Sequence, residues 1–216
     1  IGTKSLKICL GESQPTAFIG IPKAQIARII LGWARSTVER VITVAAPWWW
    51  MGDTLAEVRA AARIDEHRFQ MADTQPDELA AILFTSGSTG VPKGVMYTHG
   101  NFMAQVEAIR ETYQIQPGEI DLPTFPLFAL FDPALGMSTV IPEMDFTRPA
   151  DVNPSYLFQA IRDFGITNMF GSPALLDTVA REGEAQQMKL PTLRRVISAG
   201  APVPAAVMAS FSEMLS

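Results

Sequence analysis

The chain has 216 residues, a net charge of −5, 48% hydrophobic residues and 18% charged residues. This composition excludes a disordered chain, and the acidic balance argues against a nucleic-acid-binding protein, which would carry a basic face. A single cysteine, Cys9, excludes an internal disulfide framework and fits a reducing compartment such as the cytoplasm. Neither a signal peptide nor a transmembrane segment is expected, because the longest nearly apolar run, 41–51, is shorter than the roughly 20 residues that span a bilayer.

Predicted helices and strands alternate along the whole chain. The predicted strands are short apolar or β-branched runs at 17–21, 40–45, 80–85, 95–98, 166–170 and 195–198. The predicted helices have apolar residues at helical spacing and begin near Ser5, Pro22, Asp53, Asn101, Pro154, Pro173 and Pro204. This alternation predicts an α/β fold with largely parallel sheets and helices on both faces.

Several local features of this pattern make specific predictions. The second helix has Ile26, Ile29, Ile30 and Trp33 on one face at helical spacing. The predicted N-cap residues are Asp53, Asn101, Asn153 and Ser172. Gly165 is expected to end the helix that begins at Pro154. The strand at 80–85 should be buried.

A polar connector at 65–78 suggests a division into an N-terminal subdomain segment, 1–72, and a second segment, 73–216. The first segment contains three consecutive tryptophans, Trp48, Trp49 and Trp50, which cannot all face one core. At least one is expected at a surface, where it meets a partner or a membrane or simply packs against neighbouring residues. The chain begins at Ile1 rather than Met, which suggests a piece of a longer protein.

The ten residues TSGSTGVPKG, at 85–94, combine four hydroxyl side chains, three glycines and one lysine after an apolar strand. Glycines allow tight turns, successive backbone N–H groups can bind an anion, and Lys93 supplies a charge suited to phosphate. A Walker A loop is excluded because Pro92 precedes Lys93 and Gly94 follows it. The alternative is a Ser/Gly-rich surface loop with a solvated lysine, and the density of these residues makes it the less favoured interpretation.

This segment resembles the phosphate-binding loop of the AMP-forming adenylating superfamily, which includes acyl-CoA synthetases, luciferases and peptide-synthetase adenylation domains. The resemblance implies binding of the β- and γ-phosphates of ATP, with Ser88 as the candidate to assist Mg²⁺. The implied phosphate-binding residues are Thr85, Ser86, Gly87, Ser88, Thr89, Gly90 and Lys93. The implied fold is a partial N-terminal large domain of an adenylate-forming enzyme, with the catalytic residues expected outside this chain.

Two further segments agree with the same family. Gly200, Ala201 and Pro202 resemble a Gly-Ala-Pro turn that packs against adenine, although an ordinary strand-to-helix turn has the same sequence. The segment 125–128, FPLF, resembles a Pro-Leu-Phe-His segment near the acyl pocket, with Ala129 in place of the histidine. The implied acyl-side residues are Phe128, Ala129, Phe131, Phe170 and Ser172. Asp132 is a candidate to orient a substrate hydroxyl, with an ordinary turn carboxylate as the alternative.

The strings at 125–150 and 171–182 most resemble the β-lactone synthetases of bacterial olefin biosynthesis. That resemblance implies adenylation of a 2-alkyl-3-hydroxy fatty acid to acyl-AMP and pyrophosphate, followed by attack of its own hydroxyl to give a β-lactone and AMP. The implied partners are ATP, Mg²⁺, a long-chain hydroxy fatty acid and enzymes of the same pathway. The alternatives are a long-chain acyl-CoA or acyl-AMP ligase, which would share these motifs, and a non-catalytic nucleotide-binding module.

Overall fold

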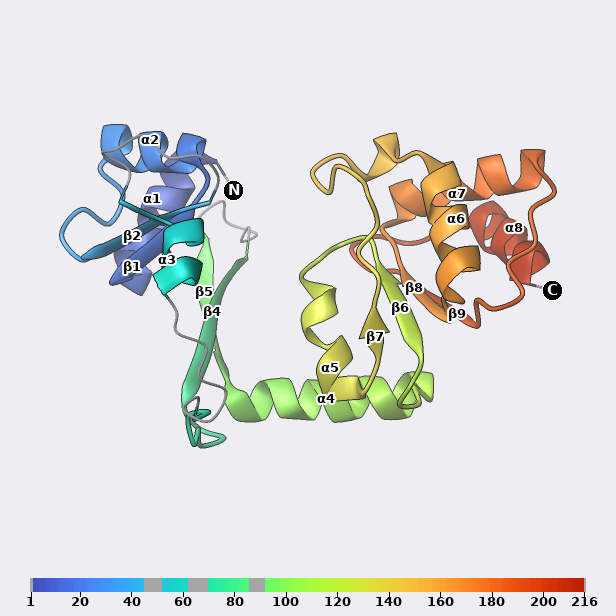
Figure 1. The fold of residues 1–216 in the computed structure, drawn as a ribbon, viewed down its shortest axis with the longest axis horizontal. Coiled ribbons are helices and arrows are strands. Elements are labelled where there is room, and N and C mark those ends of the chain that lie inside the picture. The colour runs from blue at the N-terminus through green and yellow to red at the C-terminus, as the bar shows by residue number, and fades with distance from the viewer. Residues whose placement is uncertain (1, 45–51, 62–69, 86–91, 216) are drawn as a thin grey trace. The chain divides into compact units, whose positions relative to one another are not determined.

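The computed structural model describes residues 2–44, 52–61, 70–85 and 92–215 (Figure 1). The chain divides into two compact units, 1–103 and 104–216, and each is described here by itself. The proposed division after residue 72 concerns segments of a larger domain and stays a prediction. No helix in the described ranges is long and apolar enough to cross a membrane.

The N-terminal unit contains a three-stranded parallel sheet in the order β1-β2-β3. Its strands are β1 (Ala17–Gly20), β2 (Arg40–Thr43) and β3 (Asp53–Thr54). Its first three helices are α1 (Thr3–Ser13), α2 (Pro22–Leu31) and α3 (Leu55–Ala61). The predicted helices and the two longer strands are confirmed. The two-residue strand β3 is too short to produce a periodic pattern in the sequence.

The three isoleucines that share one face of α2 are largely exposed. Ile26, Ile29 and Ile30 are 39%, 50% and 75% exposed, and only Trp33, just beyond the helix, is buried. The helix instead buries Gln25 completely, and the Gln25 Nε2 donates a hydrogen bond of 3.2 Å to the Ile42 carbonyl in β2. A polar contact to the neighbouring strand therefore sets the orientation of α2, and hydrophobic periodicity cannot indicate such a contact.

Two of the predicted N-caps, Asp53 and Asn101, are wrong, because a threonine begins each of these helices. Thr54 Oγ1 accepts from the Glu57 N–H at 2.9 Å, and the Glu57 carboxylate accepts from the Thr54 N–H at 2.8 Å. Thr98 and Asn101 exchange the equivalent two bonds, at 3.2 and 3.0 Å. Both helices therefore begin with a reciprocal capping box whose first residue is a threonine.

The remaining strands of the N-terminal unit are β4 (Leu79–Thr85) and β5 (Lys93–Thr98), which form an antiparallel hairpin followed by α4 (His99–Tyr113). The predicted burial of β4 is wrong, because Leu79 and Leu83 are 53% and 41% exposed. Within the described ranges this sheet has two strands, and so no further strand flanks β4.

The C-terminal unit contains a four-stranded parallel sheet in the order β7-β6-β8-β9, which confirms the α/β class. The strands are β6 (Ile120–Pro123), β7 (Ser138–Thr139), β8 (Asn168–Phe170) and β9 (Arg195–Ile197). The helices are α5 (Asp132–Leu135), α6 (Pro154–Phe164), α7 (Pro173–Ala185) and α8 (Ala205–Leu215), with 3₁₀ turns η1 (Phe128–Leu130) and η2 (Pro149–Asp151). Figure 1 shows α6, α7 and α8 on one side of the sheet and α5 on the other.

Three predicted helix ends in this unit are confirmed. The Asn153 side chain accepts from the Ser155 N–H at 3.1 Å, and the Ser172 side chain accepts from the Leu175 N–H at 3.4 Å. Gly165 ends α6 with φ of +61°, in the left-handed region that glycine adopts without strain.

The two faces of the C-terminal sheet differ in chemistry. Leu122 and Met169 belong to a large apolar core with residues of α6, α7 and α8. A smaller cluster of Val106, Ile115 and Leu135 packs α4 and α5 together. Asp121 and Asn168, which alternate along the strands with the core residues, are buried polar side chains.

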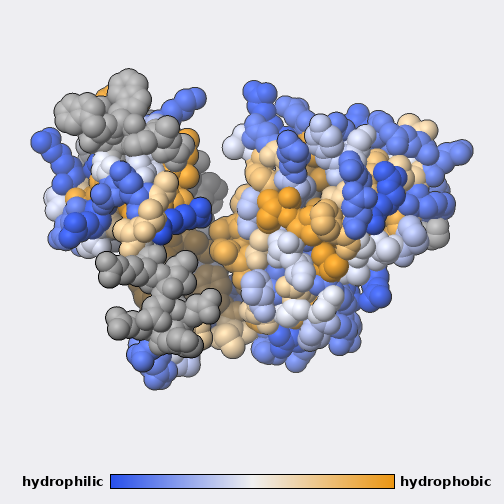
Figure 2. Space-filling view, viewed as in Figure 1, coloured by the Kyte–Doolittle hydropathy of each residue, from blue (hydrophilic) through white to orange (hydrophobic). Residues whose placement is uncertain are grey.

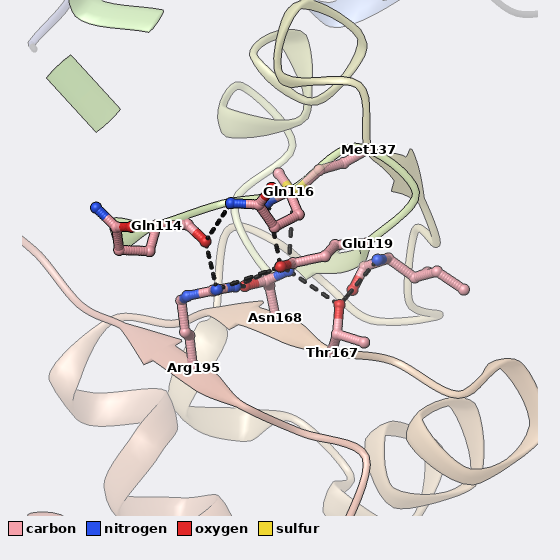
Figure 3. A network of polar contacts seen from close by, with 8 residues as sticks. Gln114, Gln116, Glu119, Met137, Thr167, Asn168 and Arg195 are labelled. Atoms are coloured by element: carbon pink, nitrogen blue, oxygen red, sulfur yellow. Dashed lines mark hydrogen bonds and ion pairs between the residues drawn. The ribbon is translucent and has the colours of Figure 1, made fainter. Parts of the chain in front are cut away.

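A polar network joins three parts of this sheet (Figure 3). The Glu119 carboxylate precedes β6, is 5% exposed and pairs with Arg195 in β9. Asn168 in β8 donates to Glu119 at 2.7 Å and accepts from Arg195 at 2.6 Å. Arg195 also donates to the Gln114 carbonyl at 2.9 Å. Burial raises the pKa of Glu119, but hydrogen bonds from Arg195, Asn168 and Gln116 outweigh it and leave that pKa below its ordinary value.

Removing the Arg195 charge should destabilise the C-terminal unit strongly. The substitution Arg195→Met leaves the Glu119 carboxylate buried without its cation, and we expect a loss of about 3–5 kcal/mol in the free energy of unfolding. Hydrogen exchange of the β8 and β9 amides measures this loss. Arg181→Met is the control, because it removes an exposed pair with Asp177 and should cost less than about 0.5 kcal/mol. Equal losses in the two variants would contradict a structural role for the network.

Candidate functional site

The loops that follow β6, β8 and β9 begin side by side at one edge of the C-terminal sheet. Thr124 donates to the Phe170 carbonyl through its backbone N–H at 3.1 Å and through its hydroxyl at 2.7 Å. Gly171 N–H donates to the Ile197 carbonyl at 3.0 Å. Ligands of open α/β sheets bind at the carboxyl ends of the strands, so a binding site is expected at this edge.

A cavity of about 390 Å³ lies at this edge. It is lined by Thr124, Phe125, Phe128, Phe146, Pro149, Phe170, Ser172, Ala199 and Gly200. The structure therefore brings together three of the predicted acyl-side residues, Phe128, Phe170 and Ser172, with Gly200 of the predicted adenine turn. The Phe128 and Phe170 rings pack with centroids 4.1 Å apart. Ala129, Ala201 and Pro202 do not line this cavity.

Apolar side chains also reach the surface beside this first cavity. Phe125, Leu127 and Leu130 are 46%, 55% and 72% exposed, and all three lie between β6 and α5. Figure 2 shows a hydrophobic area on the C-terminal unit within a largely hydrophilic surface. The aromatic lining of the first cavity and the apolar surface beside it suit an apolar ligand better than a polar one.

A second cavity, of about 230 Å³, shares Phe128, Phe170 and Ala199 with the first. The predicted acyl-side residue Phe131 lines this second cavity. The polar residues Asp121, Asp132, Asn168 and Ser198 line it as well, together with Tyr113, whose ring carries a hydroxyl. The second cavity therefore combines an apolar wall with buried groups that can form hydrogen bonds.

The two carboxyl groups of the second cavity have unusual electrostatics. Asp121 is 7% exposed, and burial together with the neighbouring Asp132 raises its pKa to about 7. Burial also raises the pKa of Asp132, although a hydrogen bond of 2.5 Å from Thr139 partly offsets the effect. Sequence reasoning missed Asp121, whose only signal was an acidic residue inside an apolar run.

The hairpin β4–β5 positions the two ends of the predicted phosphate loop. Thr85 and Lys93 are cross-strand partners, and Lys93 is the first residue of β5 rather than part of a loop as predicted. A Cβ at Gly94 would lie 3.1 Å from atoms of Ile82 and Phe84, so the close approach favours glycine there. The other predicted loop residues, Ser86, Gly87, Ser88, Thr89 and Gly90, and the tryptophans at 48–50, lie outside the described residues.

The predicted Gly-Ala-Pro turn follows β9 in the structure. Gly200 has φ of +98°, which side chains with a Cβ rarely adopt. No atom of the residues that the structure describes lies within 4 Å of a Cβ built at this position, so backbone conformation rather than space requires the glycine. The role of this turn in binding adenine stays a prediction.

The raised pKa of Asp121 predicts an unusual pH dependence of stability. Because the native carboxyl holds its proton up to about pH 7 and the unfolded one releases it near pH 4, the folded state is favoured at low pH and loses this advantage as pH rises between those values. Asp121→Asn should therefore stabilise the C-terminal unit at pH 8 relative to the unsubstituted protein, and by less at pH 5. Thermal unfolding at both pH values measures the difference, and equal shifts at the two would show that Asp121 titrates normally.

Comparison with known proteins places this geometry in a family. Residues 1–216 match the family model described as AMP-binding enzyme. The chain is 52% identical over 216 residues to the olefin beta-lactone synthetase of Xanthomonas campestris pv. campestris, and 50% identical to that of Stenotrophomonas maltophilia. All of this chain is covered in both cases, but it spans only 37% and 38% of the lengths of these two curated relatives.

The fold agrees with solved structures at low sequence identity. The crystal structure of ATP-bound MatB from Rhodopseudomonas palustris matches with a TM-score of 0.69 at 19% identity, covering 98% of this chain and 40% of that one. At this identity the likeness shows the fold alone. Because the family match covers the whole chain, the chain belongs to the AMP-binding enzyme family.

Proposed function

We propose that the whole protein activates the carboxylate of a 2-alkyl-3-hydroxy fatty acid with ATP and closes the product to a β-lactone, releasing AMP. The observation that carries this proposal is the 52% identity over the complete chain to an olefin beta-lactone synthetase. The aromatic cavity that contains Phe128, Phe170 and Ser172 supports an apolar acyl substrate. Enzymes of the same pathway as partners and a cytoplasmic location complete the proposal.

The first step requires charge neutralisation and positioning. A carboxylate oxygen of the acid attacks the α-phosphorus of ATP, the bond to the β-phosphate oxygen breaks, and pyrophosphate leaves. Lys93 carries an exposed ammonium group at the base of the β4–β5 hairpin, where it would meet phosphate oxygens held by the predicted loop. Gly200 would leave the backbone beside the cavity open to the adenine ring.

The second step is intramolecular. The hydroxyl oxygen on carbon 3 attacks the acyl carbon, the bond from that carbon to the AMP oxygen breaks, and the hydroxyl proton is released. An attacking group within the same molecule reacts at a high effective concentration, so no separate acceptor such as CoA is needed. The phenylalanine walls would hold the alkyl chains and exclude water, which would otherwise hydrolyse the acyl-adenylate.

Magnesium is proposed to arrive with ATP. Among the described residues there is no group of three or more His, Cys, Asp or Glu side chains that could hold a metal ion. Mg²⁺ commonly binds through one or two carboxylates together with substrate phosphates, so the phosphates of ATP would supply ligands to it. The bound ion would neutralise phosphate charge, with the Ser88 hydroxyl as its proposed contact in this chain.

Lys93→Ala should impair the first step. Loss of its charge from the phosphate site is expected to lower kcat/KM for ATP–pyrophosphate exchange about 100-fold, the scale seen when a transition-state donor is removed. Lys23→Ala in α2 is the matched control, because Lys23 is also exposed and lies outside the predicted site. Exchange rates that fall equally in both variants, or in neither, would remove Lys93 from the phosphate site.

The products decide between the proposed reaction and its alternative. The whole protein is incubated with ATP, Mg²⁺ and a 2-alkyl-3-hydroxy fatty acid, with and without CoA, and the products are analysed by mass spectrometry. We expect AMP and a product lighter than the acid by one water, formed without CoA. An acyl-CoA thioester formed only when CoA is present would instead establish a long-chain acyl-CoA ligase. Absence of any ATP turnover would favour a nucleotide-binding module.

A further inference from the structure

The strand register explains why two carboxyl groups meet in the second cavity. Asp121 of β6 is paired with Thr139 of β7 on one side and with Asn168 of β8 on the other. The Thr139 hydroxyl donates to the Asp132 carboxyl at 2.5 Å, which fixes that carboxyl beside the β7 residue that pairs with Asp121. The two acids are therefore fixed by adjacent strands and by one hydrogen bond.

The polar groups at this place are incompletely satisfied. Asp121 is 93% buried, since 7% of it is exposed, and in the described part of the chain its carboxyl has only the Leu122 backbone N–H as a hydrogen-bond partner. The Ser198 Oγ is buried and has no hydrogen-bond partner among the described residues. Both residues line the second cavity. Buried polar groups without partners cost free energy, so a ligand that pairs with them would be favoured.

The side-chain amide of Asn168, which also lines the second cavity, already forms hydrogen bonds within the protein. Asn168 Nδ2 donates to Glu119 at 2.7 Å and to Thr167 at 3.0 Å, and its Oδ1 accepts from Arg195 at 2.6 Å. The groups available to a ligand are therefore the Asp121 carboxyl, the Ser198 hydroxyl and the Asp132 oxygen that Thr139 does not contact. We call these three residues, Asp121, Asp132 and Ser198, the carboxyl cluster.

We propose, on the basis of the function proposed above, that the carboxyl cluster binds the hydroxyl group of the acyl substrate and selects a hydroxylated acid over the corresponding unsubstituted one. A hydroxyl both donates and accepts, which matches carboxyl oxygens at Asp121 and Asp132 that accept and a Ser198 hydroxyl that donates. An ammonium group only donates, so it would leave the Ser198 hydroxyl proton without an acceptor on the ligand.

The position of the carboxyl cluster fits this role. The two cavities share Phe128, Phe170 and Ala199, and the carboxyl cluster lines the second one, so a substrate that enters beside Gly200 would reach the carboxyl cluster past these shared residues. The alkyl groups of such a substrate would contact the phenylalanine rings while its hydroxyl contacts the acids. A site built to hydrogen-bond a hydroxyl discriminates strongly against an analogue that lacks it, because the buried groups then stay unpaired.

The test compares two acids in the first step alone. The whole protein catalyses ATP–pyrophosphate exchange with a 2-alkyl-3-hydroxy acid and with the same acid lacking the 3-hydroxyl, which can be adenylated but cannot close a lactone. We expect the hydroxy acid to have a kcat/KM at least about tenfold higher. Asp121→Leu and Ser198→Ala should bring the ratio of the two kcat/KM values close to one, chiefly by lowering the value for the hydroxy acid.

Two further variants separate recognition from structural damage. Asp121→Asn keeps the shape and a hydrogen-bonding group, and it should retain most of the preference. Asp163→Leu makes the same exchange as Asp121→Leu at an exposed position of α6, and its ratio should match that of the unsubstituted protein. If Asp121→Leu fails to fold, Ser198→Ala alone decides, because it removes a single oxygen.

The results distinguish failure of this inference from failure of the proposed function. A ratio near one in the unsubstituted protein, with lactone still formed from the hydroxy acid, would overturn hydroxyl recognition and leave the function standing. Equal losses of kcat/KM for both acids in the variants would also overturn it, because the carboxyl cluster would then shape the cavity without recognising the hydroxyl. A 3-amino acid that is preferred over the hydroxy acid would overturn the choice of ligand. Exchange with neither acid would overturn both proposals.

Discussion

The arrangement of the C-terminal unit depends on a buried carboxylate, Glu119, that is compensated by Arg195 and Asn168. A buried charge without a partner is strongly destabilising, so the strands that carry the compensating groups must stay in register. Asn168 and Arg195 are themselves cross-strand partners in β8 and β9. Because the network lies near the beginnings of these strands, it also fixes where their carboxyl ends emerge and which loops meet there.

Side chains alternate along β6 and β8, so one face of the sheet contributes to the apolar core and the other contributes to the second cavity. Leu122 and Met169 face the apolar core under α6, α7 and α8, whereas Asp121 and Phe170 line the second cavity with η1 and α5 residues. A strand that is apolar on one side only can place a carboxyl group and an aromatic ring beside a cavity without disturbing the core. The stability of the unit and the chemistry of its cavities therefore depend on the same two strands, through different residues.

Much of this organisation could be predicted from the sequence, and the failures have physical causes. The caps at Asn153 and Ser172, each followed by proline, were correct because a short side chain before Pro at N1 specifies a helix start locally. The predicted caps at Asp53 and Asn101 were wrong because these helices begin with reciprocal pairs that start at Thr54 and Thr98, which a single capping side chain does not indicate. The exposure of the α2 isoleucines could not be predicted from their spacing, because the Gln25 side chain reaches another strand.

In the candidate site, too, local sequence motifs could be recognised, whereas contacts between distant segments could not. Phe128, Phe170 and Ser172 were found through sequence resemblance, and the structure places all three on one cavity. The second cavity could not be predicted, since Asp121 and Ser198 are far apart in the sequence and meet only through strand order. Ser86 to Gly90 lie outside the described residues, and their contribution rests on the sequence alone.

The pairing of Thr85 with Lys93 has a consequence for how the length of the intervening loop can vary during evolution. Surface loops usually tolerate insertions and deletions, but both ends of this one are locked into a ladder that continues through Leu83 and Val95. A slip of one residue would turn every β5 side chain to the opposite face, Lys93 included. The spacing between Thr85 and Lys93 should therefore be inherited as strictly as the residues themselves.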